Sequence, residues 1–442
     1  MDKGFAKRIQ MFLPKYICHT TVCAIIVMLM MGCAVCASAQ GDSARYEVQV
    51  RGGAMAGHAI PHNMYARDLL TGCRLITGYN VSMGWRARGE EASESDELFG
   101  RPTIEGGLMV LDYQHVPLHN VGERGYFPGR EPSTIGQMIT PYAAVSRPLF
   151  ATRDVELGFY SMQGIGICTH PYDLVKNPEN EFVGARFAIL ISLGMYGKVR
   201  LSDHWNIGAT AQFHHYSNGR LDFPNMGINS GEGGVQLIYS LNPEHVHRKP
   251  YDWVHRADSL KTKWGKHLYV DVNASWMPRV LLAEWLCKWY HTPKTDPDYR
   301  TGKFSYHHSV ALDASLMYRY SRKFASGIGV EYIYAPIGED IKYWEDRTGS
   351  SRPLCSPHGL NVSLQHEAFY KNIGVHLSLG YYIKREPQQE NDQISPVFET
   401  VGLRYYLPVC HRRLYIGYNI RARATTADCF QFSLGYRIGG KK

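Results

Sequence analysis

Long apolar runs are scarce in this 442-residue sequence beyond its first forty positions. No later stretch approaches the roughly eighteen continuous apolar residues that a membrane-spanning helix requires, which excludes a helical membrane protein. Cysteine is also sparse: six of the ten lie beyond residue 39, without C-x-x-C pairs or the spacing of metal ligands. Disulfides are permitted, but the sequence predicts no metal and no cofactor.

Excess charge of one sign is small. The formal net charge of +8 falls to +5 when residues 1–39 are removed, because that segment holds four basic residues and one acidic residue. A mildly basic surface suits an anionic partner such as lipid phosphates but does not identify one, and no nucleic acid is predicted. What the chain does have is thirty tyrosines, 43 glycines and a negative mean hydropathy, which fit β-structure better than membrane helices.

The first 39 residues have the pattern of a secretory signal that is removed after export. Four basic residues precede an apolar run over residues 22–35: Lys3, Lys7, Arg8 and Lys15. Ala37 and Ala39 then stand at the positions of a cleavage site before Gln40. The alternatives are a lipoprotein signal acylated at Cys33, which the bulky Met31 opposes, and a retained membrane anchor.

Apolar residues alternate with small or polar residues through most of the remaining chain. In IGVHLSLGYYI, residues 373–383, every odd position is apolar, and the even positions from 374 to 380 are Gly, His or Ser. Residues 183–195, 414–420 and 430–438 repeat the pattern. Alternation over such lengths predicts long strands with one apolar face. We therefore predict an all-β fold, an antiparallel transmembrane β-barrel of the outer membrane with lipid outside and a polar interior.

About 16 segments of this kind are present, and 14 strands is the alternative count. They begin near residues 46, 74, 107, 135, 155, 183, 204, 234, 267, 308, 323, 358, 372, 398, 412 and 428. The connections are short on one side and long on the other, as in barrels with short periplasmic turns and long external loops. Two longer segments, 89–100 and 242–265, break this rule on the periplasmic side. We expect residues 40–442 to form a single barrel.

The 242–265 segment is the one candidate linker between two halves of the chain. Its three histidines, His245, His247 and His255, suggest either a metal site or a solvated loop, and the solvated loop is the commoner case. The predicted inward faces also carry charges that would line a lumen or pair within it. These are Arg186, Asp313, Arg319, Arg404, Arg421 and Arg437.

The stretch QFHHYSNGRLDFPNMGIN, residues 212–229, places a histidine and a serine two positions apart. His215 and Ser217 continue the apolar, lipid-facing side of a strand that begins near residue 204, and they stand at its external end. A hydrolase that attacks a membrane lipid needs its nucleophile at this level. The alternative is that both residues belong to the polar rim where the barrel wall meets the lipid headgroups.

This stretch resembles the active-site region of the outer-membrane lipid A 3-O-deacylases and of the longer bacterial acyloxyacyl hydrolases. The resemblance covers roughly residues 45–241, and its specific part is a His-aromatic-Ser-Asn motif. It implies that His215 is the general base and Ser217 the nucleophile. It also implies that Asn218, Gly219 and Asn225 form the oxyanion site. Residues 266–442 then supply additional strands.

The sequence departs from this family at the residue that orients the histidine. The small deacylases use a Glu, whereas the matching position here is Asn229, a neutral amide that stabilises an imidazolium less well. Glu232 is the alternative orienting residue, but its position in the alternation points it into the barrel unless a bulge at the neighbouring glycines reverses it. The third alternative is an inactive relic of the site.

The resemblance implies a hydrolase that removes a fatty-acyl ester from lipid A of lipopolysaccharide, with lipid A and the outer-membrane lipids as its partners. The competing hypothesis is a non-catalytic barrel, either a porin-like channel or a partner in envelope assembly that retains a degenerate motif. The sequence determines neither the acyl chain removed nor the oligomeric state.

Overall fold

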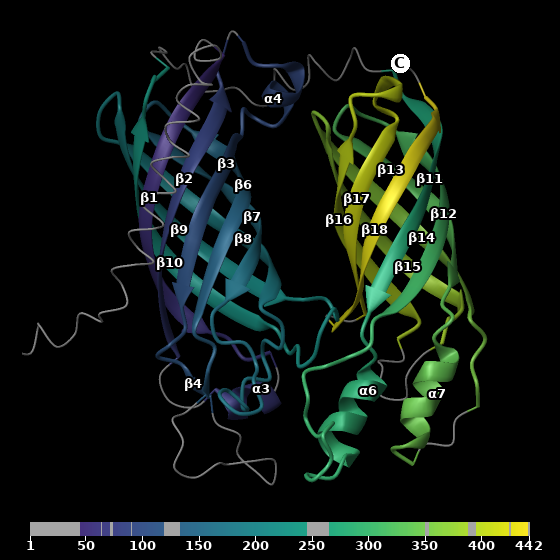
Figure 1. Cartoon of the computed structure of the whole chain (residues 1–442). Coiled ribbons are helices and arrows are strands. Elements are labelled where there is room, and N and C mark those ends of the chain that lie inside the picture. The colour runs from purple at the N-terminus through teal and green to yellow at the C-terminus, as the bar shows by residue number, and fades with distance from the viewer. Residues whose placement is uncertain are drawn as a thin grey trace, which may run out of the picture.

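The structure is a computed structural model that describes residues 45–440, apart from 63, 71–73, 90, 119–132, 245–264, 350–352, 388–394 and 424–425. Sixteen long antiparallel strands form two closed barrels of eight strands each, and the barrels stand beside one another (Figure 1). The signal segment, Cys73 and the three histidines of the 242–265 segment lie outside the described residues. No helix in the described part of the chain is long and apolar enough to cross a membrane.

The first barrel contains the eight long strands before the 242–265 segment. Its strands are β1 (Tyr46–Ala59), β2 (Leu75–Ala87), β3 (Thr103–Asp112), β6 (Gln137–Ala151), β7 (Val155–Cys168), β8 (Phe187–Arg200), β9 (Trp205–Ser217) and β10 (Ile228–Ser240). Between them lie α3 (Met64–Leu69), α4 (Glu94–Leu98) and a small sheet of β4 (Pro117–Leu118) and β5 (Ser133–Thr134). β1 pairs with both β2 and β10, which closes the barrel.

The second barrel follows the same plan. Its strands are β11 (His267–Arg279), β12 (His307–Arg319), β13 (Phe324–Tyr334), β14 (His358–Tyr370), β15 (Ile373–Lys384), β16 (Val397–Tyr406), β17 (Leu414–Arg423) and β18 (Thr426–Gly439). Its helices are α6 (Leu282–Leu286), the π-helix η1 (Cys287–His291), α7 (Gly338–Asp346) and the 3₁₀ turn η2 (Cys410–Arg412). β11 pairs with both β12 and β18 and closes this barrel separately.

The predicted class and strand number are confirmed, and each predicted start lies within six residues of an observed strand. The prediction of one barrel over residues 40–442 is wrong. Alternation along a strand reveals which face meets lipid, but closure depends on which distant strands share hydrogen bonds, and the sequence pattern does not encode that choice. The predicted halves, 45–241 and 266–442, correspond to the two barrels.

The two ends of the barrels differ in their connections. Short turns and α4 lie at one end, where the chain also terminates, while α3, β4, α6 and α7 lie at the other (Figure 1). Outer-membrane barrels have short turns at the periplasmic end and longer loops at the external end, so we call the α4 end periplasmic and the other end external. The outer wall is apolar: Leu193 on the first barrel and Leu377 on the second are 50% and 44% exposed.

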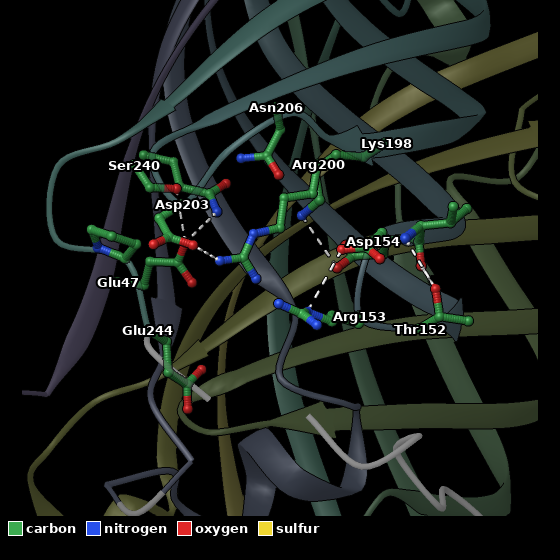
Figure 2. A pocket seen from close by; sticks show the side chains of 14 residues that line it. Glu47, Thr152, Arg153, Asp154, Lys198, Arg200, Asp203, Asn206, Ser240 and Glu244 are labelled. Atoms are coloured by element: carbon green, nitrogen blue, oxygen red, sulfur yellow. Dashed lines mark hydrogen bonds and ion pairs between the residues drawn. The ribbon is translucent and has the colours of Figure 1, made fainter. Parts of the chain in front are cut away.

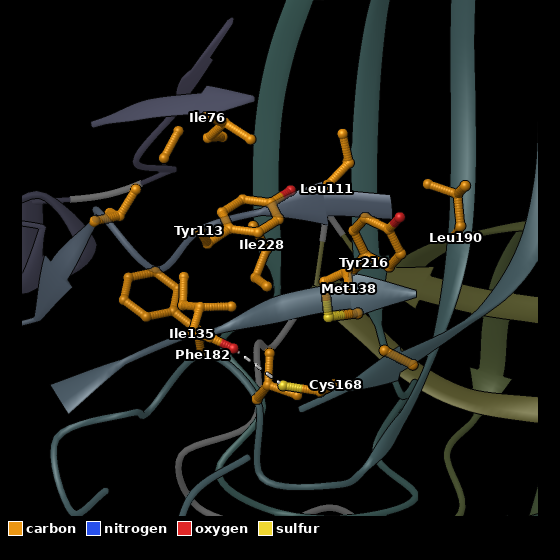
Figure 3. Packing of buried hydrophobic residues seen from close by; sticks show 14 of the residues in the cluster. Ile76, Leu111, Tyr113, Ile135, Met138, Cys168, Phe182, Leu190, Tyr216 and Ile228 are labelled. Atoms are coloured by element: carbon orange, nitrogen blue, oxygen red, sulfur yellow. Dashed lines mark hydrogen bonds between the residues drawn. The ribbon is translucent and has the colours of Figure 1, made fainter. Parts of the chain in front are cut away.

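Side chains fill the interior of the first barrel. At the periplasmic end the lining is charged, with Arg86 and Lys198 both paired to Glu156, at 2.7 and 3.2 Å. The cavity there has a volume of about 30 Å³, which suits a water rather than a lipid (Figure 2). At the external end an apolar cluster around Tyr113, Met138 and Tyr216 closes the barrel (Figure 3).

The interior of the second barrel is a network of paired charges. Glu367 is fully buried and lies 2.9 Å from Arg404 and 3.2 Å from Arg437. Five of the six predicted lumen charges do point inward: Asp313, Arg319, Arg404, Arg421 and Arg437. The sixth was placed wrongly, because Arg186 precedes β8 and is exposed. An eight-stranded barrel has an interior just wide enough for its side chains or one small ligand, so neither barrel has the width of a 16-stranded porin channel.

Candidate active site

Two neighbouring strands carry the polar residues that the sequence singled out. β9 runs outward to Ser217, and after the loop 218–227 the chain returns as β10. The register places Asn229 directly opposite His215. His215, Ser217 and Asn229 are partly exposed on the outer face, as the alternation predicted for His215 and Ser217.

The residue between His215 and Ser217 anchors this strand end. Tyr216 points inward, is fully buried in the external apolar cluster (Figure 3), and its hydroxyl lies 2.8 Å from that of Thr140. Because side chains alternate along a strand, fixing Tyr216 inside fixes the positions of its two neighbours outside. Ile228 anchors β10 beside Asn229 in the same way.

His215 is oriented by Asn229. The His215 Nδ1 atom lies 2.6 Å from the Asn229 Oδ1 atom. An amide oxygen only accepts hydrogen bonds, so Nδ1 carries the proton and donates it, which leaves Nε2 as the basic nitrogen. This is the tautomer that a histidine base requires, held here by a neutral acceptor instead of a carboxylate.

The alternative orienting residue, Glu232, lies on the other side of the wall. Its carboxylate is 2.5 Å from Nδ1 of His214, and both side chains are buried in the interior. The register between β9 and β10 runs without a bulge from Ile228 to Tyr239. The bulge that would have turned Glu232 outward is therefore not formed, and Glu232 does not reach His215.

Two N–H donors converge on the Ser217 hydroxyl. The Gly219 backbone N–H and the Asn225 side-chain amide each donate to Oγ over 3.2 Å. Asn218 was predicted to belong with them, but its backbone N–H donates instead to Asn225 Oδ1 over 3.1 Å. Asn218 thus fixes the amide of Asn225 so that its nitrogen faces Ser217.

The loop conformation depends on one glycine in particular. Gly219 has a φ of +60°, in the left-handed region that suits glycine best, and this turns its N–H back toward Ser217. Farther along, the backbone N–H groups of Met226 and Gly227 donate to the carbonyls of Glu181 and Phe182. The segment before β8 therefore also holds the loop 218–227 in place.

The hydrogen bonds of the described residues do not include one between the His215 ring and the Ser217 hydroxyl. The two side chains share a face but stand two residues apart, roughly 6.6 Å along a strand. Within the same described part of the chain, no group of three or more His, Cys, Asp or Glu side chains is arranged to hold a metal ion.

Sequence reasoning missed one acidic residue at this site. Asp222 lies in the loop, where its Oδ1 accepts from the Phe223 N–H over 2.8 Å and its carbonyl accepts from the Asn218 amide over 3.1 Å. Burial raises the pKa of Asp222 to about 6, against the lowering effect of the Phe223 hydrogen bond. As the one carboxylate of residues 217–229, Asp222 was visible in the sequence, but nothing there indicated its burial.

Comparison with protein families gives two matches. The model for Lipid A 3-O-deacylase (PagL) matches residues 76–237, and the model for the C-terminal domain of acyloxyacyl hydrolase matches residues 290–441. The first match falls within the first barrel and the second largely within the second barrel. Together they cover most of the chain.

Comparisons with individual proteins add little. No curated protein matches this sequence. Among solved structures, OccK5 (OpdH) of Pseudomonas aeruginosa aligns at 9% identity over 89% of this chain and 98% of that chain, with a TM-score of 0.20. OccAB1 of Acinetobacter baumannii aligns at 8% identity over 89% and 95%, with a TM-score of 0.22. TM-scores this low support no conclusion about shared architecture or function.

Proposed function

Because this chain belongs to the family of lipid A 3-O-deacylases and acyloxyacyl hydrolases, we propose that it removes a fatty-acyl chain from lipid A with Ser217 as the nucleophile. The family supports lipid A deacylation at the outer membrane as the general activity. The observation that carries the residue-level proposal is the convergence on the outer wall of a histidine of defined tautomer, a serine and two N–H donors.

In the first step His215 Nε2 takes the proton of the Ser217 hydroxyl as Oγ attacks the ester carbonyl. The attack forms the bond from Oγ to the carbonyl carbon, and the carbonyl oxygen takes the negative charge. The hydrogen bond between His215 Nε2 and the Ser217 hydroxyl forms in the complex with lipid A, since catalytic hydrogen bonds often tighten only when substrate is bound.

The Gly219 N–H and the Asn225 amide stabilise that negative charge. Both point at Oγ in the free protein, so they stand beside the position where the new oxyanion develops. Donors fixed before the reaction cost no reorganisation during it, and one such donor contributes on the order of a hundredfold to the rate.

The tetrahedral intermediate then collapses. The bond from the carbonyl carbon to the sugar oxygen breaks, and the imidazolium of His215 gives its proton to that oxygen, which leaves as a hydroxyl group. His215 next activates a water, which attacks the acyl-enzyme and releases the fatty acid and free Ser217. Asn229 orients the ring throughout and contributes no full charge.

Purified protein incubated with lipopolysaccharide and followed by mass spectrometry tests this proposal. We expect lipid A to lose the mass of one acyl chain, and Ser217→Ala and His215→Ala each to reduce the rate by at least about a thousandfold. The matched control is His214→Gln, which changes the adjacent histidine on the interior side and should leave the rate within about threefold. Intact lipid A after incubation with folded wild-type protein would favour a structural role in the envelope.

A further inference from the structure

The loop that supplies the oxyanion donors is held from its far side by the second barrel. The backbone N–H of Val280, just after β11, donates to the Arg220 carbonyl over 2.9 Å. The Arg220 guanidinium lies 3.6 Å from the carboxylate of Asp428 at the start of β18. Residues some sixty and two hundred positions away thus contact the residue next to Gly219.

Aromatic contacts also join the loop to the second barrel, farther along the chain at Phe223. The Phe223 ring stacks on Trp285 of α6, with ring centroids 5.4 Å apart and planes 20° apart, and it meets the edge of Phe304 at 6.2 Å. Pairs of this geometry add roughly 0.5–1.5 kcal/mol beyond the area they bury. Phe223 is itself buried.

Phe430 shows most clearly that the loop of the first barrel covers part of the second barrel. Along β18 the residues 430, 432 and 434 share the outer face, and Phe432 and Leu434 are 43% and 55% exposed. Phe430 is only 1% exposed, because the loop of the first barrel lies on it. A Cβ added to Gly219 would come within 2.3 Å of the Phe430 ring.

We infer that the second barrel is a positioning element of the active site. Trp285, Phe430 and Val280 hold residues 219–223 so that the Gly219 N–H and the Asn225 amide stay aimed at Ser217. This inference rests on the proposed function and deepens it. The first barrel alone would keep His215 and Ser217 but would lose the support for the oxyanion donors on one side.

The opposite end of the molecule provides a matched control. There Asp96 of α4 accepts hydrogen bonds from Lys371 over 2.8 Å and from the Tyr370 hydroxyl over 2.6 Å, which joins the same two barrels at their periplasmic ends. This junction lies at the other end of the strands from the loop 218–227 (Figure 1). Weakening it loosens the barrels without touching the site.

The experiment compares full-length variants by lipid A deacylation and by amide exchange of residues 218–227. Trp285→Ala and, independently, Phe430→Ala should lower kcat by about tenfold or more with KM within about twofold, because a small misplacement of catalytic donors is costly. Both should speed amide exchange in the loop. Trp285→Phe should restore most of kcat, and Lys371→Met should change neither readout.

The two readouts separate this inference from the proposed function. If wild-type protein does not deacylate lipid A but Trp285→Ala and Phe430→Ala still speed loop exchange, the positioning contact stands and the proposed function fails. If either variant folds with wild-type exchange and wild-type kcat, or if Lys371→Met lowers kcat as much as Trp285→Ala, the second barrel is not a positioning element.

Discussion

The two barrels share one architecture and differ in what their walls carry. The seventh strand of each, β9 and β17, ends on the external side. The last outward positions of β9 are His215 and Ser217, whereas those of β17 are Ile420 and Ala422. Under the proposed function, the barrel wall provides a rigid frame, and the chemistry comes from two outward residues and the loop that follows them.

The external ends of the two barrels also differ. The first barrel buries an apolar cluster beneath its site, and this cluster fixes Tyr216 and Ile228 between the outward polar residues. Both barrels bury ion pairs, such as Arg86–Glu156 in the first and Arg404–Glu367 in the second, but α6 and α7 lie at the external end of the second barrel (Figure 1). The clearest difference is therefore at the external ends, where the first barrel carries the polar residues of the site and the second barrel carries helices, of which α6 meets the loop of the first barrel.

The largest expected effect tests whether the second barrel depends on its interior. Glu367→Ala would leave the buried Arg404 and Arg437 with only the more distant Asp271 carboxylate, at 3.5 and 3.9 Å, which should cost about 3–5 kcal/mol of unfolding free energy. Urea unfolding followed by heat-modifiable migration measures this loss. Glu367→Gln, which keeps the shape and some hydrogen bonds, should cost less, and equal costs would show that shape rather than charge stabilises the interior.

A second test asks whether both outer walls face lipid alike. Leu377→Arg on the second barrel and Leu193→Arg on the first should each cost roughly 2–4 kcal/mol, because both place a charge against hydrocarbon. Leu377→Met, which keeps the lipid contact, serves as the control in the same unfolding measurement. A cost on the first barrel alone would mean that the second barrel is not embedded to the same depth.

The sequence was sufficient to predict the walls and the outward direction of the site residues. Alternation alone placed His215 and Ser217 outside and Glu232 inside, and the register of the structure then places Asn229 opposite His215. Successive side chains of a strand point to opposite faces, so one buried residue such as Tyr216 determines that its two neighbours point outward.

Barrel closure and the junction could not be predicted in the same way. Whether β10 returns to β1 or continues to β11 depends on hydrogen bonds between segments far apart in the sequence, and either choice satisfies the same alternation. The contact of Phe223 with Trp285 joins a loop to a short helix. Neither segment has a periodic pattern, so nothing local indicates that they meet.

A smaller effect is expected at Asn229, which orients the His215 ring. Asn229→Asp keeps the length of the side chain and places a carboxylate 2.6 Å from His215 Nδ1, where it would stabilise the imidazolium of the transition state. We expect kcat for lipid A to rise by about tenfold, or about 1.4 kcal/mol. The change Asn229→Ala should lower it, since the tautomer is then no longer held. A fall with Asp would indicate that the neutral amide is the better partner at this exposed position.

The smallest effect concerns Asp222, in the loop where the two barrels meet. Burial raises the pKa of Asp222 to about 6, so the folded loop favours the protonated carboxyl. The stability that this protonation contributes is fully present below about pH 4 and is lost as the pH rises to about 6. Asp222→Asn, which keeps the acceptor for the Phe223 N–H, should therefore raise the thermal midpoint at pH 7.5 but not at pH 4. Asp154→Asn, at an exposed periplasmic turn, should show no such dependence on pH in the same melting series. If the difference between Asp222→Asn and wild type is the same at both pH values, the carboxylate is not buried against the second barrel, and the junction is looser than the contacts of Phe223 imply.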